Sequence, residues 1–455
     1  MMIQRKPAQI PVLKKADVVV VGGGPAGVGA AVAAARQGAK VLLIEKNGFL
    51  GGNITACYVE NCNYFLRNRH FTKLGLYGEI ADNCYRKYSN DNAREFNRTC
   101  FSSETLKVYL DNLMADNGVE VLLHSFVNEV ILTEGYVDAV IIQTKKGPAA
   151  VIPGMVIDTT GDGDVAFAAG IPFEQGRDED GLCQPGTVNL RLAGADTEAL
   201  LKDGDQLKAI GKHFKEEYRA GRTGLSCIRQ DIPFGRLTKA GQISYVNYTC
   251  EYGLDPTSVE DLSKGEAACR RYGMEIYQYL KTHYEPLRNI EIASFAPTIG
   301  FRDSRRIKGL YRLTIEDMEA QKHFDDCIAA FPRFYDMLSP DANMGGDGKV
   351  EGKGYQGHIF EPVTDDRMFE IPYRCLIPFG TANMLMAGRC ISADHVAESG
   401  VRAISLCMMM GEAAGTAAWL ALRDRVKPEK IDVSQLQEKL RESNLCVPDG
   451  KACHE

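Results

Sequence analysis

The chain has 455 residues, of which 25% are charged and 45% hydrophobic, a composition typical of a globular protein. That length is enough to bury a large core and predicts two domains. The net charge of −7 argues against a broad surface for nucleic acid or for an anionic membrane. We find no apolar run of the length that spans a bilayer, and no apolar stretch follows the basic first residues. Neither a membrane helix nor a secretory signal is therefore expected.

The 14 cysteines are scattered along the chain and form no C-x-x-C pair, which argues against a zinc or iron–sulfur site. Without an export signal, the expected state of these cysteines is the free thiol in a reducing cytoplasm.

The first chemical motif is a glycine-rich turn after an apolar strand that ends at Val21. Gly22, Gly24 and Gly27 form G-x-G-x-x-G, and the alanine-rich residues that follow predict a helix over 30–36. Gly22 permits a sharp turn, Gly24 lets a pyrophosphate approach the backbone, and Gly27 lets helix and strand pack closely. The free N–H groups at the start of the helix favour a phosphate.

A second predicted strand, over residues 40–44, ends at Glu45, which lies 18 residues after Gly27. A carboxylate at this place can accept hydrogen bonds from a ribose diol. A lone G-x-G-x-x-G could be no more than a glycine-rich turn. Because strand, helix, second strand and acidic residue all follow in register, the sequence predicts a dinucleotide site.

The rest of the first unit predicts polar helices and then a β-meander that ends at an acidic, glycine-containing loop. A loop of small residues spans 47–53. The loop at 158–164 follows a buried strand, and the carboxyl ends of such strands face the ligand in doubly wound sheets. The predicted elements are helices within 60–118 and strands at 119–124, 127–132, 137–144 and 149–157.

Composition changes after Gly176, and residues 180–340 mix strands with amphipathic helices, which predicts a second domain. Residues 341–357 are glycine-rich and polar, as in a loop or lid. The chain then becomes apolar again and ends in a polar tail or surface helix. Within these parts we expect strands at 186–192 and 241–250, a helix at 259–284, apolar segments at 373–377 and 384–388, and a long helix at 405–422.

Several further motifs resemble one family over residues 16–425. They are the glycine motif, Leu50-Gly51-Gly52, and the segments 158–164, 300–309, 371–378, 386–392 and 411–418. With them the chain resembles the FAD-dependent oxidoreductases that have a single dinucleotide-binding domain, within the glutathione-reductase-like superfamily. This resemblance implies the α/β class, with a Rossmann-like FAD-binding domain (parallel sheet, helices, β-meander) and an inserted α+β substrate domain. It divides the chain into 1–176 with a helical insertion at about 60–118, 177–345, 346–425 as the returning FAD-binding segment, and a tail at 426–455.

The resemblance also implies which residues bind FAD. Gly22 to Gly27 would hold the pyrophosphate, Glu45 the ribose, and the backbone of Val127 the adenine. Val401 and Arg402 precede the last helix, whose N-terminus would stabilise negative charge on the reduced flavin. The full set is Gly22, Gly24, Pro25, Ala26, Gly27, Glu45, Lys46, Gly51, Gly52, Asn53, Val127, Thr160, Gly161, Asp162, Gly388, Arg389, Val401 and Arg402. Asp164 could instead serve a turn or helix cap, and residues 408–418 could serve close packing alone.

Candidate catalytic groups come from two segments. Arg302, Arg305 and Arg306 could together clamp an anionic substrate, or they could pair internally with Asp303 and Glu291. His395 could act as an acid–base group or be held by local hydrogen bonds. Arg302, Arg305 and His395 are the chosen candidates, and Tyr373 and His358 are weaker ones. Where relatives often carry Asp-Ile-His, this chain reads Asp336-Met337-Leu338.

The expected activity is hydride transfer between FAD and a small organic, possibly anionic, substrate, with an unspecified electron partner. One alternative is a thiol/disulfide enzyme, because Cys57 and Cys62 have the spacing of a redox disulfide. However, Cys57 comes five residues after Gly52 rather than two, and no second dinucleotide motif follows. The other alternative is a flavin-dependent RNA-modifying or RNA-binding protein, which the acidic net charge disfavours.

Overall fold

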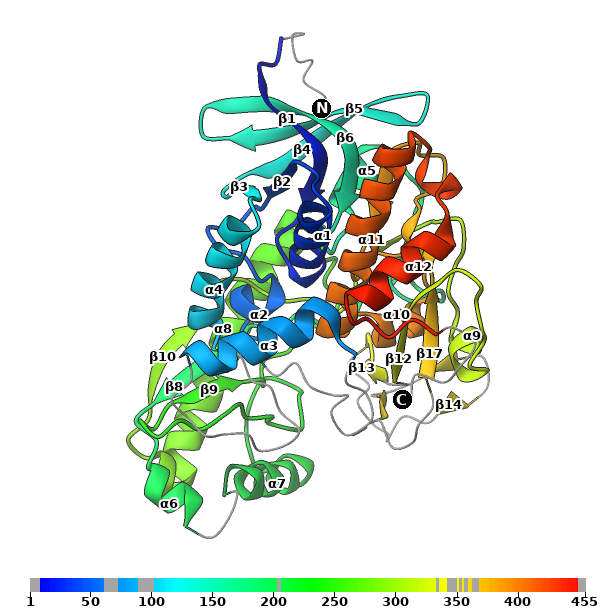
Figure 1. Cartoon of the computed structure of the whole chain (residues 1–455). Coiled ribbons are helices and arrows are strands. Elements are labelled where there is room, and N and C mark those ends of the chain that lie inside the picture. The colour runs from blue at the N-terminus through cyan, green and yellow to red at the C-terminus, as the bar shows by residue number, and fades with distance from the viewer. Residues whose placement is uncertain are drawn as a thin grey trace, which may run out of the picture.

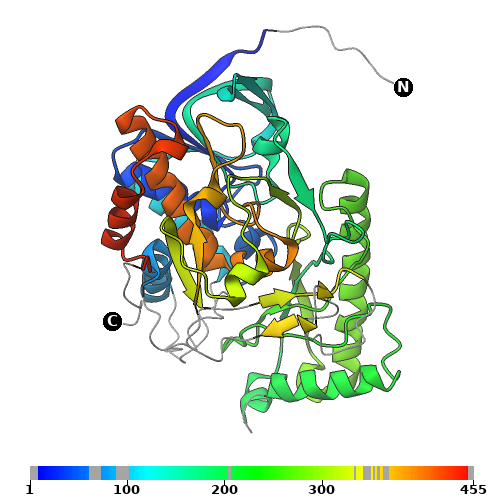
Figure 2. The same cartoon turned by 90° about the vertical axis from the view of Figure 1, so that its right-hand side faces the viewer.

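The computed structural model describes residues 9–60, 73–88, 102–202, 206–332, 335–341, 350–351, 354–355, 359–361 and 368–448. Two bodies are visible in Figures 1 and 2: a larger one built on a central sheet, and a smaller one around β8, β9 and α8.

The larger body contains a seven-stranded sheet in the order β3-β2-β1-β6-β5-β4, with β18 also paired to β6. Strands β3, β2, β1, β6 and β18 are parallel, whereas β5 and β4 continue from β6 as an antiparallel meander. The predicted α/β class, parallel sheet and meander are thus confirmed. The strands are β1 (Val12–Val21), β2 (Val41–Ile44), β3 (Glu120–Leu122), β4 (Phe126–Thr133), β5 (Tyr136–Thr144), β6 (Gly147–Asp158) and β18 (Met384–Met386).

Helices α1 (Pro25–Arg36) and α11 (Ile404–Asp424) lie side by side against this sheet (Figure 1). They approach so closely that a Cβ on Gly411 would lie 2.0 Å from the Ala26 carbonyl oxygen, and one on Gly415 would lie 2.2 Å from that of Ala30. Close packing therefore accounts for the glycines of the last long helix. Helices α3 (Gly75–Tyr88) and α4 (Ser103–Asp116) lie within the predicted helical insertion.

Helix α11 contains an apolar stretch long enough to span a bilayer, which the sequence analysis did not expect. By length and mean hydropathy (1.3 over its most apolar 18 residues) it could cross a membrane, yet 89% of that window is buried inside the protein. Its apolar surface is covered by α1, α12 and the sheet, as expected of a core helix.

The smaller body has its own hydrophobic core, which includes Leu190, Phe214, Ile276 and Leu280. Its antiparallel sheet has the order β10-β8-β9, so the expected strands are present but shorter than predicted. Its elements are β8 (Leu190–Ala193), α6 (Thr197–Leu201), α7 (Gln206–Arg219), β9 (Ile243–Val246), α8 (Val259–His283), η1 (Glu285–Leu287) and β10 (Glu291–Phe295).

Residues after β10 return to the larger body. Ile307, Ile328 and Phe331 belong to the hydrophobic cluster of the central sheet, although they fall within the predicted second domain; the boundary at 345 stays a prediction. The predicted loop at 341–357 lies mostly outside the described residues. The remaining elements are α2 (Asn53–Ala56), α5 (Asp164–Ala168), β7 (Phe173–Gln175), β11 (Arg305–Ile307), α9 (Ile315–Glu319), β12 (Cys327–Pro332), β13 (Tyr335–Met337), β14 (Val350–Glu351), β15 (Gly354–Tyr355), β16 (Ile359–Glu361), β17 (Met368–Pro372), η2 (Tyr373–Leu376), α10 (His395–Val401), η3 (Pro428–Lys430) and α12 (Val433–Glu442).

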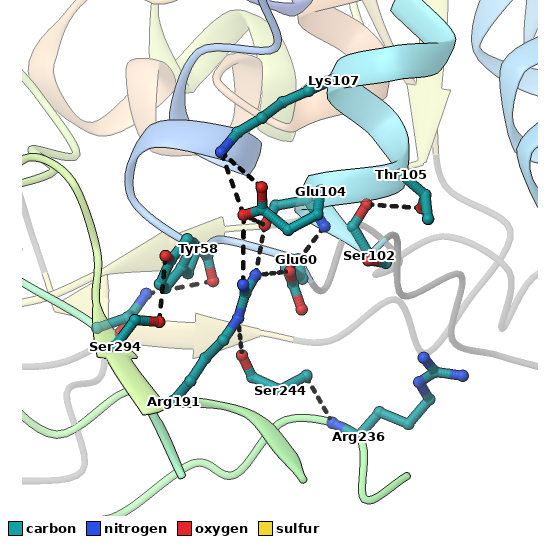
Figure 3. A network of polar contacts seen from close by, with 12 residues as sticks. Tyr58, Glu60, Ser102, Glu104, Thr105, Lys107, Arg191, Arg236, Ser244 and Ser294 are labelled. Atoms are coloured by element: carbon teal, nitrogen blue, oxygen red, sulfur yellow. Dashed lines mark hydrogen bonds and ion pairs between the residues drawn. The ribbon is translucent and has the colours of Figure 1, made fainter. Parts of the chain in front are cut away.

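A buried polar network around Arg191 of β8 joins the two bodies (Figure 3). Its guanidinium contacts Glu60 Oε1 at 2.5 Å, donates to Ser103 Oγ and to the Ser244 carbonyl, and lies 3.8 Å from the centre of the Tyr58 ring. The Ser103 N–H also donates to Glu60. Burial raises the pKa of the Glu60 carboxyl, and the charge of Arg191 opposes that rise.

Candidate cofactor and substrate site

The glycine turn, Gly22–Gly27, connects β1 to α1 in the geometry that its spacing predicts. Gly22 has φ +104°, and a Cβ on it would lie 2.4 Å from the Thr159 carbonyl oxygen. A Cβ on Gly27 would lie 1.7 Å from the Gly22 carbonyl oxygen. By contrast, a Cβ on Gly24 would meet only Gly52 Cα, at 3.8 Å. The turn is thus tightly packed behind and open at Gly24, where a phosphate would approach.

A second glycine loop lies against this turn. The Gly51 N–H donates to the Gly23 carbonyl oxygen at 2.8 Å, and both Gly51 and Gly52 have positive φ. Helix α1 begins with Pro25, and no side chain among the described residues caps its N-terminus by a hydrogen bond. Asn53, at the start of α2, is exposed. This arrangement fits a pyrophosphate between the two glycine loops.

A cleft with about 330 Å³ of empty space lies at the carboxyl ends of β1, β2 and β6. Glu45 is buried beside it, with Oε2 accepting from the Gly23 N–H at 2.6 Å and Oε1 from the Asn47 N–H at 2.7 Å. Each carboxylate oxygen keeps a lone pair for a ribose hydroxyl. The cleft is lined by five of the predicted residues, Gly22, Glu45, Lys46, Val127 and Thr160, with Val21, Ile44, Ser125, Phe126 and Asp164. These residues fit the adenosine half of FAD.

The loop after β6 and the residues after β18, which the sequence predicted as separate parts of the FAD site, contact each other. Arg389 Nη2 lies 2.5 Å from Asp162 Oδ1, and Nε donates to the Gly161 carbonyl at 3.0 Å. The loop is held beneath by fully buried Asp158, which accepts from the Thr160 N–H and hydroxyl and from the Ala166 N–H. Burial raises the pKa of Asp158 to about 6. The structure therefore brings Gly161, Asp162, Gly388 and Arg389 together, and their contact with FAD stays a prediction.

Arg305 and Arg306 have the internal partners that the sequence left open as the alternative to a clamp. Arg305 Nη1 pairs with Asp164 Oδ1 at 3.0 Å and its guanidinium stacks on Phe167, so it ties β11 to the start of α5. Arg306 is buried and donates to the carbonyls of Ala393 and Gly176. Both side chains bind internal partners, and these partners differ because consecutive strand residues point to opposite faces.

Arg302 differs from these two. Within the described ranges its partly buried guanidinium has no hydrogen bond or ion pair. Burial lowers its pKa, Asp336 raises it, and the charges of Arg402 and Arg229 lower it further. The backbone just before Arg302 is held in place, because Arg389 Nη1 donates a hydrogen bond to the Phe301 carbonyl oxygen.

The neighbours of Arg302 are already paired. Arg402 donates to the Asp336 carbonyl, and its Nη2 lies 3.6 Å from Asp336 Oδ2. Arg229 Nε lies 2.8 Å from Asp231 Oδ1, and Nη1 donates to Asn247 Oδ1 at 2.9 Å. We call Arg302, Arg402 and Arg229 the arginine site. Arg229 was missed by sequence reasoning, and no local motif marks it.

His395 lies at the start of α10 and is buried. Its Nε2 is 2.7 Å from Asp303 Oδ2, and the Gln184 N–H donates to Asp303 Oδ1 at 2.8 Å. This agrees with a histidine held by local hydrogen bonds, and a catalytic role stays a prediction. Tyr373 is also buried and donates to the Pro428 carbonyl, which makes it a structural residue. His358 lies outside the described residues.

The thiol of Cys57 is buried, 3.6 Å from Thr298 Oγ1, and burial raises its pKa to about 11. A thiol with this pKa is protonated at neutral pH and is a poor nucleophile. Cys62 lies outside the described residues. Ten described cysteines are free thiols as expected, whereas Cys446 is disulfide-bonded and corrects that expectation.

Known proteins resemble parts of this chain. A digeranylgeranylglycerophospholipid reductase of Methanothermobacter thermautotrophicus is 30% identical over 199 residues, 40% of this chain and 48% of that protein. A cinnamate reductase of Clostridium sporogenes is 63% identical over 46 residues, 9% of this chain and 7% of that protein. The chain thus matches less than half the length of these curated relatives.

Solved structures resemble the chain at low identity and with TM-scores below 0.5. A p-nitrophenol 4-monooxygenase of Pseudomonas putida has a TM-score of 0.48 at 12% identity, over 96% of this chain and 88% of that one. A geranylgeranyl bacteriochlorophyll reductase-like protein of Thermoplasma acidophilum has a TM-score of 0.45 at 14% identity, over 94% and 83%. Likenesses at this level say nothing about a substrate.

The model of one protein family, described as FAD dependent oxidoreductase, matches residues 17–440. That range includes the glycine turn, the adenosine cleft, the arginine site and the last long helix. It spans most of the chain, so the match concerns the whole architecture and not the glycine motif alone. Neither the thiol/disulfide nor the RNA alternative receives support from these matches. The chain is an enzyme that uses FAD and belongs to the FAD-dependent oxidoreductase family.

Proposed function

We propose that this enzyme transfers a hydride between FAD and a small organic anion that binds at the arginine site. The observation that carries the proposal is Arg302, a partly buried guanidinium without a partner in the described part of the chain. The arginine site holds three positive charges against the two carboxylates of Asp336 and Asp231. One further anion would balance this set, and a carboxylate matches the fork of a guanidinium.

FAD, when bound, supplies the hydride chemistry, and the chain supplies binding and orientation. The N-terminus of α1 and the glycine loops would bind the pyrophosphate, and Glu45 the ribose. Arg402 precedes α11, which has no side-chain cap at its N-terminus. The charges of Arg402 and of Arg229, which belongs to the smaller body, both act on Arg302, so Arg302 would orient the substrate between the two bodies.

The proposal can be tested by anaerobic bleaching of the bound flavin with pairs of compounds that differ only in a carboxylate or its neutral amide. NADH and NADPH belong in the same panel. We expect bleaching by members of the anionic series, and Arg302→Gln should raise KM about 10- to 100-fold, the cost of losing a charged hydrogen bond. The matched control is Arg288→Gln, because Arg288 is exposed and its ion pair in the described structure is a surface contact with Glu285.

Equal bleaching by acids and amides would contradict the proposed substrate charge. A protein that releases no FAD on denaturation would contradict the cofactor assignment itself. The proposed electron partner is a carrier, a protein or NAD(P)H, and the proposed location is the cytoplasm. No nucleic-acid partner is proposed; strong, salt-sensitive RNA binding in a co-purification assay would overturn that part.

A further inference from the structure

Helix α10 buries an acid that neither the cofactor motifs nor the arginine site uses. Glu398 is fully buried, and neither of its carboxyl oxygens has a hydrogen-bond partner among the described residues. It does not cap the helix, since Asp394 accepts from the Val396 and Ala397 N–H groups. A carboxylate left in this way would carry a large desolvation cost.

Three other buried polar groups also lack a partner within the described part of the chain: Gln184 Nε2, Ser304 Oγ and Arg306 Nη1. All belong to one framework. Asp303 accepts from Gln184 and pairs with His395, which lies one helical turn before Glu398, and Ser304 and Arg306 follow Asp303 in the chain. Four unsatisfied groups on one framework indicate ordered water, which typically makes two to four hydrogen bonds at a polar site.

The charges that face Glu398 come from several elements. Asp303 precedes β11, Arg306 lies on β11, Arg389 follows β18, and Arg402 ends α10. Asp336 on β13, which packs on α10, is paired to Arg402, and the thiols of Cys183 and Cys407 are nearby. On α9, which also packs on α10, Asp317 is bound by Lys322 and Tyr311.

The arginines that face Glu398 are bound elsewhere. Arg389 pairs with Asp162, Arg402 pairs with Asp336, and Arg306 donates to the carbonyls of Ala393 and Gly176. No described donor therefore reaches either oxygen of Glu398. Desolvation also raises the pKa of Glu398 well above its ordinary value, with the charge of Asp303 adding to the rise. The missing donor and the burial both favour the protonated acid.

We propose that Glu398 is a neutral acid bound to enclosed water, and that its neutrality keeps a further negative charge away from Arg389, Arg402 and the cofactor. An ionised Glu398 would compete with Asp162 and Asp336 for these two arginines. It would also oppose the negative charge that reduction brings to the flavin. Glu398 is thus a positioning residue. The inference rests on the FAD cofactor and not on the proposed substrate.

The direct test is infrared spectroscopy of the holoenzyme at neutral pH. We expect a carbonyl band of a protonated carboxylic acid that Glu398→Gln removes. Glu412→Gln is the matched control. Glu412 is another buried acid, on α11 rather than α10, and its replacement should remove a different carbonyl band. Ser304→Ala should shift the Glu398 band, because it removes a partner of the enclosed water. Absence of the band in the native protein would overturn the proposal.

The second readout is the ratio of oxidised to reduced flavin against a reference dye. Glutamine mimics the neutral acid, so we expect Glu398→Gln to leave this ratio within about twofold of the native value. A tenfold shift toward reduced flavin would mean that native Glu398 is ionised, and would overturn the proposal. A high-resolution crystal structure should show water bonded to Glu398 and Ser304, and a dry cavity there would also contradict it.

Discussion

The glycine turn and the arginine site lie in the same protein but are built in different ways. The glycine turn uses backbone groups of adjacent residues, and its geometry follows from three missing side chains. The arginine site uses long side chains from residues 229, 302 and 402, two of them in the larger body and one in the smaller. A backbone site can therefore be found from local spacing, whereas a side-chain site depends on which distant segments meet.

The largest expected effect is at the glycine turn. Gly27→Ala places a Cβ 1.7 Å from the Gly22 carbonyl oxygen, a clash with backbone that no side-chain movement can relieve. We expect little folded, flavin-bound protein, measured as flavin absorbance per chain. Gly24→Ala is the matched control: its Cβ meets no atom closer than 3.8 Å, so the chain should fold but bind FAD more weakly. Equal flavin content in both variants would contradict the expected difference between Gly27 and Gly24.

A large effect is also expected where side chains join the two bodies. Arg191→Ala removes the 2.5 Å ion pair to buried Glu60 together with the contacts of the guanidinium to Ser103 and Ser244. We expect a loss of about 3–5 kcal/mol in the free energy of unfolding, measured by urea denaturation. Adding Glu60→Gln should recover part of this loss, because a buried charge is then removed. No recovery in the double variant would show that lost packing, rather than charge, is the cause.

A pH-dependent effect is expected at Glu412, whose Oε1 accepts from the Leu76 N–H at 2.9 Å. Burial raises the pKa of this carboxyl to about 8, above its value in the unfolded chain. The native state then holds a proton that the unfolded state has released, so the free energy of unfolding falls by about 1 kcal/mol per unit as pH rises toward 8. Glu412→Gln keeps the acceptor and should remove this fall in urea titrations at pH 5.5 and 7.5. If the free energy of unfolding depends on pH in the same way in the native protein and in Glu412→Gln, the raised pKa of Glu412 is refuted.

The smallest effect is expected at Cys57. Its pKa of about 11 keeps the thiol protonated, so Cys57→Ser should change the rate of flavin reduction by less than about twofold. The measurement is stopped-flow reduction under anaerobic conditions. Complete loss of turnover would restore the thiol/disulfide hypothesis.

Much of the fold could be predicted because its signals are local. The parallel strands that end at Val21 and Ile44, the meander after residue 126 and the helix at 259–283 all follow from apolar runs, alternation and helical periodicity. The apolar helix at 404–424 was harder, since composition alone cannot tell a core helix from a membrane helix. Its burial depends on contacts with α1 and the sheet.

The predicted site divides in the same way. Gly22, Gly27 and Glu45 have the geometry expected from their spacing, because each contacts residues fixed by the same β-α-β unit. Arg302, Arg305 and Arg306 looked equivalent in the sequence, yet two are bound internally and one is not. Strand alternation and the partners Asp164 and Gly176, far away in the chain, made that difference.

By itself, the sequence determined a dinucleotide-binding α/β protein, because glycine conformations and hydrophobic periodicity act between near neighbours. Only the tertiary structure decided that Asp162 meets Arg389, that His395 is held by Asp303, and that Glu398 is enclosed without a partner among the described residues. The physical reason is that the charge and burial of a side chain depend on segments that are far apart in the sequence, by 92 residues for Asp303 and His395 and by 227 for Asp162 and Arg389, and that meet only in the folded chain.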